Sequence, residues 1–231
     1  MGAGGRVDVT GADARGGRDP GDRRPTQPRD HALAAPRRRR LVFSPYWDVP
    51  PSIMHKELLP KARRDGGFLE RNRYEIVDGG ERVMAPTSSA LSTVAAGRAR
   101  IRQLPGPTNS LGRVKFIFPN AHNVYFHDTP SQAPFGRARR DASHGCIRLS
   151  DPSRLARFML RRQAGWDSTR IAAAMSRVTP QQVTLTRPVP VHIVYATAVA
   201  REDGRVFFFD DIYGHDRTLA RLIAAGYPYA R

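Results

Sequence analysis

The sequence of 231 residues contains a single cysteine, Cys146. A lone cysteine cannot form a disulfide within the chain, and no Cys-x-x-Cys pair is present. The sequence therefore excludes a disulfide-stapled fold and a zinc site built on paired cysteines. Two roles are left for the thiol: packing as a small apolar side chain, which is the commoner role of an isolated cysteine, or chemistry.

Long apolar runs are also missing. The longest, near residues 191–200, is interrupted by His192 and Thr197 and is too short to cross a bilayer. The first residues have no apolar segment of the kind that signal peptides carry. We therefore expect neither a signal peptide nor a transmembrane segment in this chain.

Acidic residues are in the minority, since 38 Lys and Arg against 21 Asp and Glu give a formal net charge of +17. Such a charge attracts polyanions of any kind, including nucleic acid, anionic lipid and cell-wall carboxylates. No aromatic-interleaved RNA-binding motif or basic heptad helix is present, so we expect no nucleic-acid partner. Residues 1–40 hold 10 Arg and 5 Asp with almost no apolar periodicity. We expect them to be a disordered tail, followed by one domain over residues 41–231.

The run Ser143-His144-Gly145-Cys146-Ile147-Arg148 surrounds the cysteine, and His127 lies 19 residues upstream of it. A cysteine attacks as the thiolate, which an imidazole can generate and a cationic neighbour can stabilise. Gly145 has no side chain, so backbone N–H groups near Cys146 could converge on an oxyanion. The pattern indicates a thiol nucleophile. The alternative chemistry is a zinc site of His127, His144 and Cys146, for which no fourth ligand stands at a usual spacing.

Strand patterns outnumber helical patterns around this motif. Residues 123–127 are β-branched and aromatic, so we expect a strand that places His127 at its end, on one face with Tyr125. The other strands expected are 115–118, 183–186, 191–199 and 205–209, and the helices expected are 52–64, 153–164, 169–178 and 217–225. Residues 78–100 show no clear period. The pattern predicts a mainly β core with peripheral helices, an α+β fold.

These residues resemble the catalytic domain of L,D-transpeptidases of the YkuD type, and they are similar above all to its YcbB-like branch. The family pattern is a histidine, a variable loop, and Ser/Thr-His-Gly-Cys-x-Arg. Segments that match in order over about residues 41–217 are 45–53, 57–61, 102–107, 109–112, 114–116, 190–193, 203–204 and 211–214. The resemblance implies a YkuD-like β-sandwich core at about 100–215 and a helical substrate-capping insertion at about 46–95.

The resemblance also assigns roles. Cys146 matches the nucleophile, and His127 matches the general base that later acts as acid. Gly145 and Cys146 match the backbone oxyanion site, which Ser143 and His144 line.

Three further positions match the family around the substrate. Arg148 matches an arginine that supports the loop or the substrate, and Tyr125 and Trp47 match aromatic positions that flank it. The group that orients the histidine is often a backbone carbonyl in this family, so we nominate no side chain for His127.

The implied reaction is peptidoglycan cross-linking in the cell envelope. The thiolate takes the third residue of a donor tetrapeptide stem as a thioester, D-alanine leaves, and an acceptor amine resolves the thioester. Use of water as the acceptor would make the protein an L,D-carboxypeptidase. No cofactor or metal is implied, and carbapenems are expected to acylate Cys146.

The main departure from the family is at the start of the chain. Residues 1–40 contain no recognisable anchor, scaffold region or early strands of the β-sandwich. We therefore expect a core that is incomplete at its N-terminal edge, with unpaired strand edge exposed. The competing hypothesis is a truncated, non-catalytic fragment that keeps the site residues.

Overall fold

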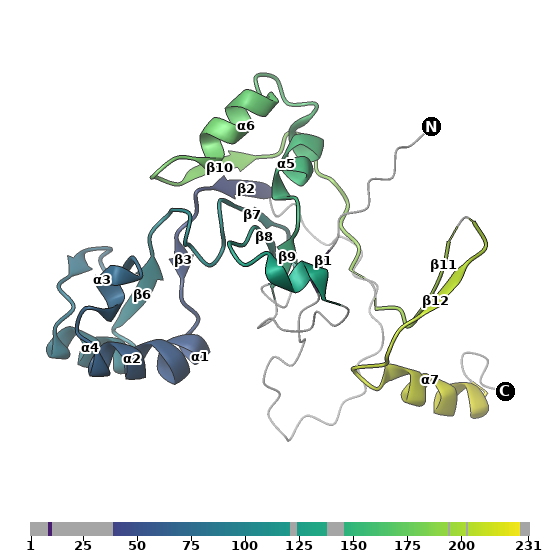
Figure 1. The fold of residues 1–231 in the computed structure, drawn as a ribbon, viewed down its shortest axis with the longest axis horizontal. Helices are drawn as coiled ribbons and strands as arrows, with labels where there is room; N and C mark the ends of the chain where they lie inside the picture. The colour runs from purple at the N-terminus through teal and green to yellow at the C-terminus, as the bar shows by residue number, and fades with distance from the viewer. Residues whose placement is uncertain are drawn as a thin grey trace. The chain divides into compact units, whose positions relative to one another are not determined.

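The structure is a computed structural model that describes residues 9–10, 39–120, 124–137, 146–193, 195–201 and 203–226. Within these residues the fold is α+β, with three sheets and several helices (Figure 1). The chain divides into two compact units, Met1–Val189 and Pro190–Arg231. The range expected for the core, about 100–215, extends across the boundary between the two units. No described helix is both long enough and apolar enough to cross a bilayer.

A six-stranded sheet forms the centre of the first unit, and only the pair β8–β9 is parallel within it. The strands in spatial order are β1 (Val9–Thr10), β9 (Ile147–Leu149), β8 (Phe126–His127), β7 (Val114–Ile117), β2 (Arg40–Phe43) and β10 (Gln181–Thr184). One face of the sheet carries a hydrophobic cluster with α5 (Pro152–Leu160) and α6 (Ser168–Met175). The buried members from the sheet include Leu41, Phe43, Val114, Phe116 and Leu149.

The helices of this layer start where the sequence predicts. The side chains of Asp151 and Asp167 accept hydrogen bonds from the backbone N–H groups of Arg154 and Arg170, three residues further on. Such N-caps satisfy donors that have no partner within the helix. The helix expected at 153–164 ends earlier, at Leu160.

The opposite face of the sheet is polar, because side chains alternate along each strand. Lys115 on β7 is the cross-strand partner of His127 on β8, and His127 is in turn the partner of Arg148 on β9. Residues in register on neighbouring strands project to the same face. Three basic side chains from three strands therefore form one row, which we call the basic row.

Two expectations differ from the structure at this sheet. The strand expected at 123–127 covers only Phe126–His127; Asn123 lies outside the described residues. The side chain of Asn120 accepts from Val124 N at 3.0 Å and donates to Val124 O at 2.7 Å, which takes Val124 out of the sheet's hydrogen bonding. Val9–Thr10, part of the segment expected to be disordered, pairs with β9, whereas residues 1–8 and 11–38 lie outside the description.

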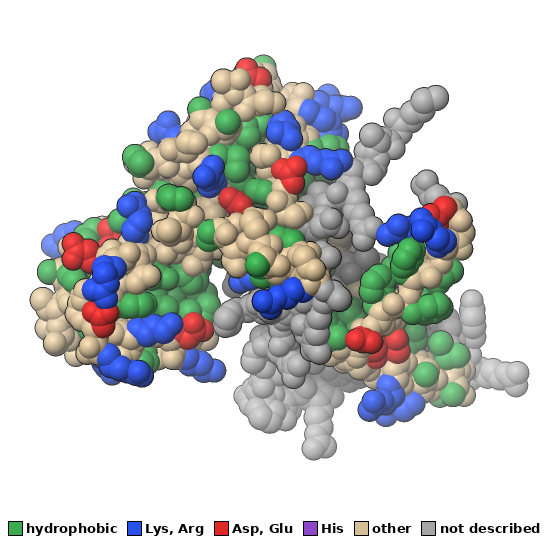
Figure 2. Space-filling view, in the orientation of Figure 1, with side chains coloured by type: hydrophobic (Ala, Val, Ile, Leu, Met, Phe, Trp, Pro, Cys, Tyr) green, Lys and Arg blue, Asp and Glu red, His purple; other side chains and the backbone are tan. Residues whose placement is uncertain are grey.

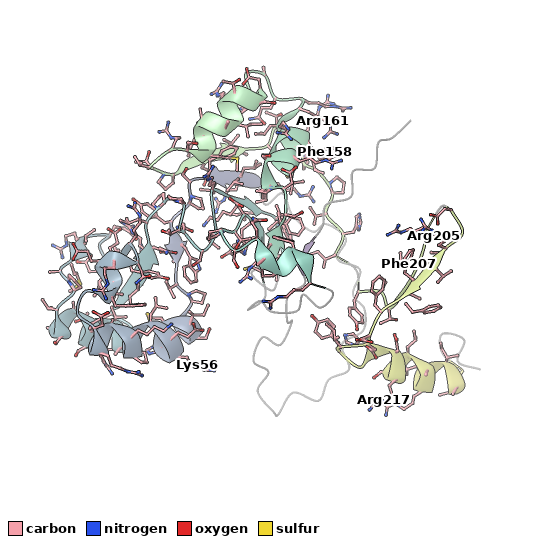
Figure 3. All side chains as sticks on the ribbon, viewed as in Figure 1. Lys56, Phe158, Arg161, Arg205, Phe207 and Arg217 are labelled. Carbon is pink, nitrogen blue, oxygen red and sulfur yellow. The ribbon has the colours of Figure 1, made fainter. Side chains whose placement is uncertain are left out.

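The second unit consists of the hairpin β11 (Ala198–Ala200) and β12 (Val206–Phe208), followed by α7 (His215–Ala224). Hydrophobic side chains are visible along the hairpin and the helix in Figure 2. Figure 3 labels Phe207 on β12 and Arg205 immediately before this strand. The strand expected at 191–199 is wrong for residues 191–193 and 195–197, which are not in a strand. Several of these residues have apolar side chains, but no neighbouring strand among the described residues pairs with them.

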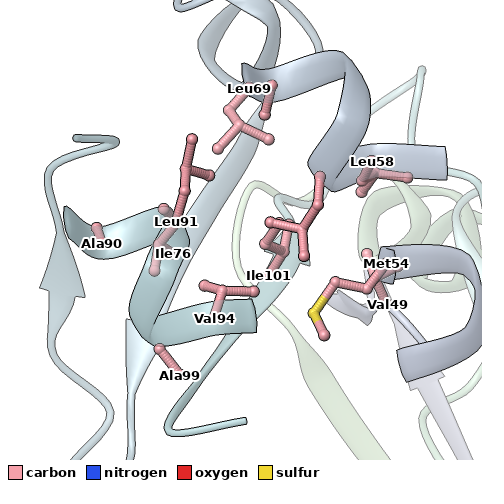
Figure 4. Packing of buried hydrophobic residues seen from close by; sticks show 12 residues of the cluster. Val49, Met54, Leu58, Leu69, Ile76, Ala90, Leu91, Val94, Ala99 and Ile101 are labelled. Carbon is pink, nitrogen blue, oxygen red and sulfur yellow. The ribbon is translucent and has the colours of Figure 1, made fainter. Parts of the chain in front are cut away.

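A second sheet in the first unit has the order β3 (Trp47–Asp48), β6 (Ala99–Gln103), β4 (Tyr74–Asp78) and β5 (Val83–Met84). Helical residues 51–64 cover it, as α1 (Pro51–Ile53), a π-helical turn (Met54–Leu58) and α2 (Leu59–Arg64), with α3 (Phe68–Arg71) and α4 (Ser88–Ala95) beside them. Their apolar side chains pack around Ile76 and Ile101, as Figure 4 shows. These elements occupy the residues expected for the capping insertion, and we call them the capping module.

Pro60 lies inside the helical residues 51–64, in α2. Proline has no N–H to donate, so an α-helix cannot pass through it with its hydrogen bonds intact. Here the turn before Pro60 is π-helical, so Leu59 N donates to Met54 O, five residues earlier in the chain.

Candidate active site

The pairing of β8 with β9 brings the two main candidates into one place. Ile147 N donates to Tyr125 O at 3.1 Å, and His127 is in parallel register with Arg148. Cys146 immediately precedes β9, so it lies beside the start of β8, and its side chain is half-buried. The strand β9 lies between Cys146 and the helix α5.

His127 is oriented by a backbone carbonyl. Its Nδ1 lies 2.5 Å from Asp128 O, and the ring is only 5% exposed. A carbonyl can only accept, so Nδ1 carries the proton and Nε2 keeps a lone pair for a substrate or thiol proton. The neighbouring carboxylate of Asp128 is used elsewhere, since it accepts from Arg113 N at 2.8 Å and Thr129 N at 2.7 Å.

The environment of His127 favours its neutral form. Burial lowers the pKa of His127 to about 4, and the positive charges of Arg148 and Lys115 act in the same direction. The hydrogen bond to the Asp128 carbonyl acts in the opposite direction but does not compensate. At neutral pH the imidazole is therefore uncharged, which is the state that can accept a proton.

Tyr125 lies between the histidine and the cysteine. Its ring centroid is 5.9 Å from that of His127, and its hydroxyl shares a hydrogen bond with the Cys146 side chain. Burial raises the pKa of Tyr125, and the negative charge of a Cys146 thiolate raises it further. A tyrosine held in its protonated form can donate a hydrogen bond to a thiolate, so Tyr125 faces the Cys146 sulfur.

Lys115 and Asp48 are neighbours of the site that the sequence did not reveal. Lys115 Nζ lies 5.9 Å from the ring centroid of Tyr125. Burial lowers the pKa of Lys115, whereas the negative charges of Asp48 and of a Cys146 thiolate raise it. Asp48, at the end of β3, is coupled electrostatically to Lys115 and Tyr125, and its exposed carboxylate also accepts from Arg100 Nε at 3.0 Å. Only cross-strand register and the placement of β3 reveal these neighbours.

The other predicted site residues are distributed as follows. Trp47 packs on the capping module, with its ring centroid 6.3 Å from that of Tyr74. Ser143, His144 and Gly145 lie outside the described residues. Among the described residues, no three His, Cys, Asp or Glu side chains gather as metal ligands would, and the zinc alternative requires His144.

Comparisons with known proteins identify the family of this chain. Residues 20–191 match the family model of the L,D-transpeptidase catalytic domain, YkuD. A relative in Haemophilus influenzae, named "Putative L,D-transpeptidase", is 32% identical over 180 residues, which cover 78% of this chain and 36% of the relative. The chain thus spans about a third of the length of the curated relative it matches. The chain belongs to the family of YkuD L,D-transpeptidase catalytic domains.

Proposed function

We propose that this protein is a cysteine-dependent peptidoglycan L,D-transpeptidase of the cell envelope. The observation that carries the proposal is the pairing of β8 with β9, which sets the neutral, carbonyl-oriented His127 next to the strand that Cys146 precedes. Membership of the family supports the acyl-transfer chemistry.

The first half-reaction uses both residues. His127 Nε2 takes the proton of the Cys146 thiol, and the sulfur attacks the carbonyl carbon of the third residue of a donor tetrapeptide stem. The C–N bond to the terminal D-alanine breaks, and His127 returns its proton to the departing amine. A thioester on Cys146 remains.

The second half-reaction reverses the proton path. An amine of a second stem attacks the thioester carbonyl, His127 takes a proton from that amine, and the sulfur leaves as the C–S bond breaks. Backbone N–H groups at Gly145 and Cys146, with Ser143 and His144 beside them, hold the oxyanion in both steps. Arg148 supports this loop, and Trp47 and Tyr125 flank the stem peptide, as in the YcbB-like branch.

Intact mass spectrometry of the full chain tests the proposal. Incubation with a disaccharide-tetrapeptide is expected to give a thioester adduct and free D-alanine, and a carbapenem is expected to give a stable adduct. Cys146→Ala abolishes both adducts, and His127→Gln slows their formation by at least about a hundredfold.

The remaining outcomes separate the alternatives. An adduct that persists in Cys146→Ala refutes the nucleophile, and loss of activity with a chelator points to the zinc site. Release of D-alanine without any cross-linked product assigns water as the acceptor. A folded chain that forms no adduct is the non-catalytic fragment.

A further inference from the structure

The burial of His127 creates an energetic difficulty for the reaction. An ordinary thiol has a pKa of about 8.5, whereas burial lowers the pKa of His127 to about 4. The buried imidazole is a weak base, so a group that stabilises the thiolate would assist proton transfer from the sulfur. A cation or a hydrogen-bond donor beside the sulfur is the ordinary means.

The structure supplies both beside Cys146. The hydroxyl of Tyr125 hydrogen bonds with the cysteine side chain, and the ammonium of Lys115 is electrostatically coupled to it. Lys115 reaches this position because it is in register with His127 on the polar face of the sheet. Its Nζ lies on the same side of the sheet as the Tyr125 ring, 5.9 Å from the centroid.

Several charged groups face Lys115 from the neighbouring elements. The carboxylate of Asp48 on β3 favours its charged form, and the guanidinium of Arg40 on β2 disfavours it. His127 on β8 is neutral, so it does not repel the ammonium. The Cys146 thiolate is a second anion that attracts the ammonium of Lys115.

We propose that Lys115 is a positioning residue of this active site: from the strand beside His127, its ammonium stabilises the Cys146 thiolate together with the Tyr125 hydroxyl, while Asp48 keeps it charged. Two residues of the basic row thereby have different roles. His127 moves the proton, and Lys115 stabilises the anion that the proton leaves behind. The proposal rests on the proposed function, in which Cys146 is the nucleophile.

The test is the pH dependence of Cys146 alkylation by iodoacetamide, in which the thiolate forms an S–C bond and iodide leaves. Because Cys146 is the only cysteine, intact mass reports its alkylation alone. The variants are Lys115→Met, Lys115→Arg and Asp48→Asn in the full chain. The chain has three lysines among its 38 basic residues, and Lys56, exposed on the capping module, provides the matched control Lys56→Met.

Loss of the ammonium in Lys115→Met is expected to move the midpoint of the alkylation profile upward by about one pH unit, which is about a tenfold lower rate at neutral pH. Lys115→Arg retains the charge and is expected to restore most of the rate. Asp48→Asn removes the carboxylate that keeps Lys115 charged, so its midpoint is expected to move upward, by less than that of Lys115→Met. Lys56→Met is expected to match the unmodified chain.

A profile for folded Lys115→Met that superimposes on that of the unmodified chain overturns the proposal. If Lys115→Met does not fold, the exposed Asp48→Asn decides, and an unmoved or lowered midpoint overturns the proposal. If Lys115→Met raises KM for the donor tetrapeptide but leaves both kcat and the alkylation profile unchanged, Lys115 is a substrate-binding residue instead. Failure of the unmodified chain to form a thioester removes the proposed function, while the alkylation profiles still decide the role of Lys115.

Discussion

His127 is the residue whose ionisation the structure defines most clearly. Its side chain is buried, and it lies in the sheet between two cations, Lys115 and Arg148. Like charges on directly opposed strand positions repel each other, so protonation of the imidazole would place three cations in one row. The neutral imidazole is the arrangement compatible with this row.

The acid limb of activity follows from this. We expect kcat/KM for D-alanine release to fall with decreasing pH around about 4, the pKa of His127, and not around the ordinary histidine value of about 6.5. The measurement is a pH–rate profile on the donor tetrapeptide. An acid limb centred near the ordinary value contradicts the buried, uncharged state of His127.

The same shift has a consequence for stability. The pKa in the folded state, about 4, is below the unfolded value of about 6.5, so the unfolded chain binds the proton first as pH falls. Stability is unaffected above the unfolded value, declines between the two values by on the order of 3 kcal/mol, and levels off below the folded value. The free energy of unfolding of His127→Gln, measured by urea denaturation across this range, is expected to lack this slope. An equal slope in both proteins contradicts the prediction.

Gly112 supports the histidine through Asp128. Its backbone φ is +60°, and a Cβ placed on it would lie 2.4 Å from Asp128 Cγ. Gly112→Ala therefore adds backbone strain and displaces the residue whose carbonyl orients His127. We expect a loss of about 2 kcal/mol or more in the free energy of unfolding, together with a fall in kcat.

Gly97→Ala is the matched control. The φ of Gly97 is +71°, and a Cβ there meets nothing within 4 Å. We therefore expect Gly97→Ala to cost only the backbone strain, about 1 kcal/mol of the free energy of unfolding, and to leave kcat unchanged. Equal effects of the two substitutions on kcat would argue against a role for the Asp128 contact.

Among the structural elements, the segment between β6 and β7 depends on one buried side chain. The Nδ2 of Asn109 donates to Pro45 O at 3.1 Å and Leu104 O at 3.0 Å, and its Oδ1 accepts from Leu111 N at 2.8 Å. Asn109 is fully buried. It thus connects the segment between β2 and β3 to the residue that follows β6. Both segments join a strand of one sheet to a strand of the other.

Asn109→Asp keeps the shape and removes the donor. A carboxylate would then face carbonyl oxygens without water, which we expect to cost about 3 kcal/mol or more of the free energy of unfolding. Asn72→Asp makes the same change at an exposed residue whose amide donates to Phe68 O, and its cost should stay below about 1 kcal/mol. Thermal denaturation of both variants measures the difference, and similar losses would contradict the prediction.

How well the sequence predicted each element depended on whether local signals or tertiary partners form it. The helices expected at 153–164 and 169–178 from their apolar spacing are both found, as α5 and α6. Helix α4 lies in the segment without clear period, because its Ser and Thr residues are poor helix formers. Its buried residues Ala90, Leu91 and Val94 are recognisable as core residues only once the sheet of the capping module is known.

The site divides in the same way. The motif and the strand pattern identify Cys146 and His127, because nucleophile and base have recognisable residue types. Lys115 and Asp48 were missed, because a lysine in a strand and an aspartate in a turn are ordinary residues until the register of β7 with β8 and the position of β3 are known.

At the scale of the whole molecule, the two units differ in what stabilises them. The first unit contains two hydrophobic clusters, whereas α7 in the second has no buried residue. Leu219, Leu222 and Ile223 lie at the spacing of one helical face and are exposed, as are Val206 and Phe208 on the hairpin.

Polar contacts within the second unit hold its elements together locally. Tyr195 donates its hydroxyl hydrogen to Asp211 at 2.9 Å, Thr197 does the same to Asp216 at 2.9 Å, and Asp211 accepts from His215 N and Asp216 N at the start of α7. A single exposed hydrogen bond contributes about 1 kcal/mol or less, which does not replace a hydrophobic core.

Hydrogen exchange followed by mass spectrometry is expected to separate the two units. Amides open locally with free energies that range from near zero to that of global unfolding, according to the buried contacts that hold them. Peptides covering β2, β7 and α5 should therefore exchange at the rate of global unfolding, and peptides covering α7 should exchange at least about a hundredfold faster. Protection of α7 equal to that of β7 would mean that its apolar face is covered in solution, and the exposed face described above would then be wrong.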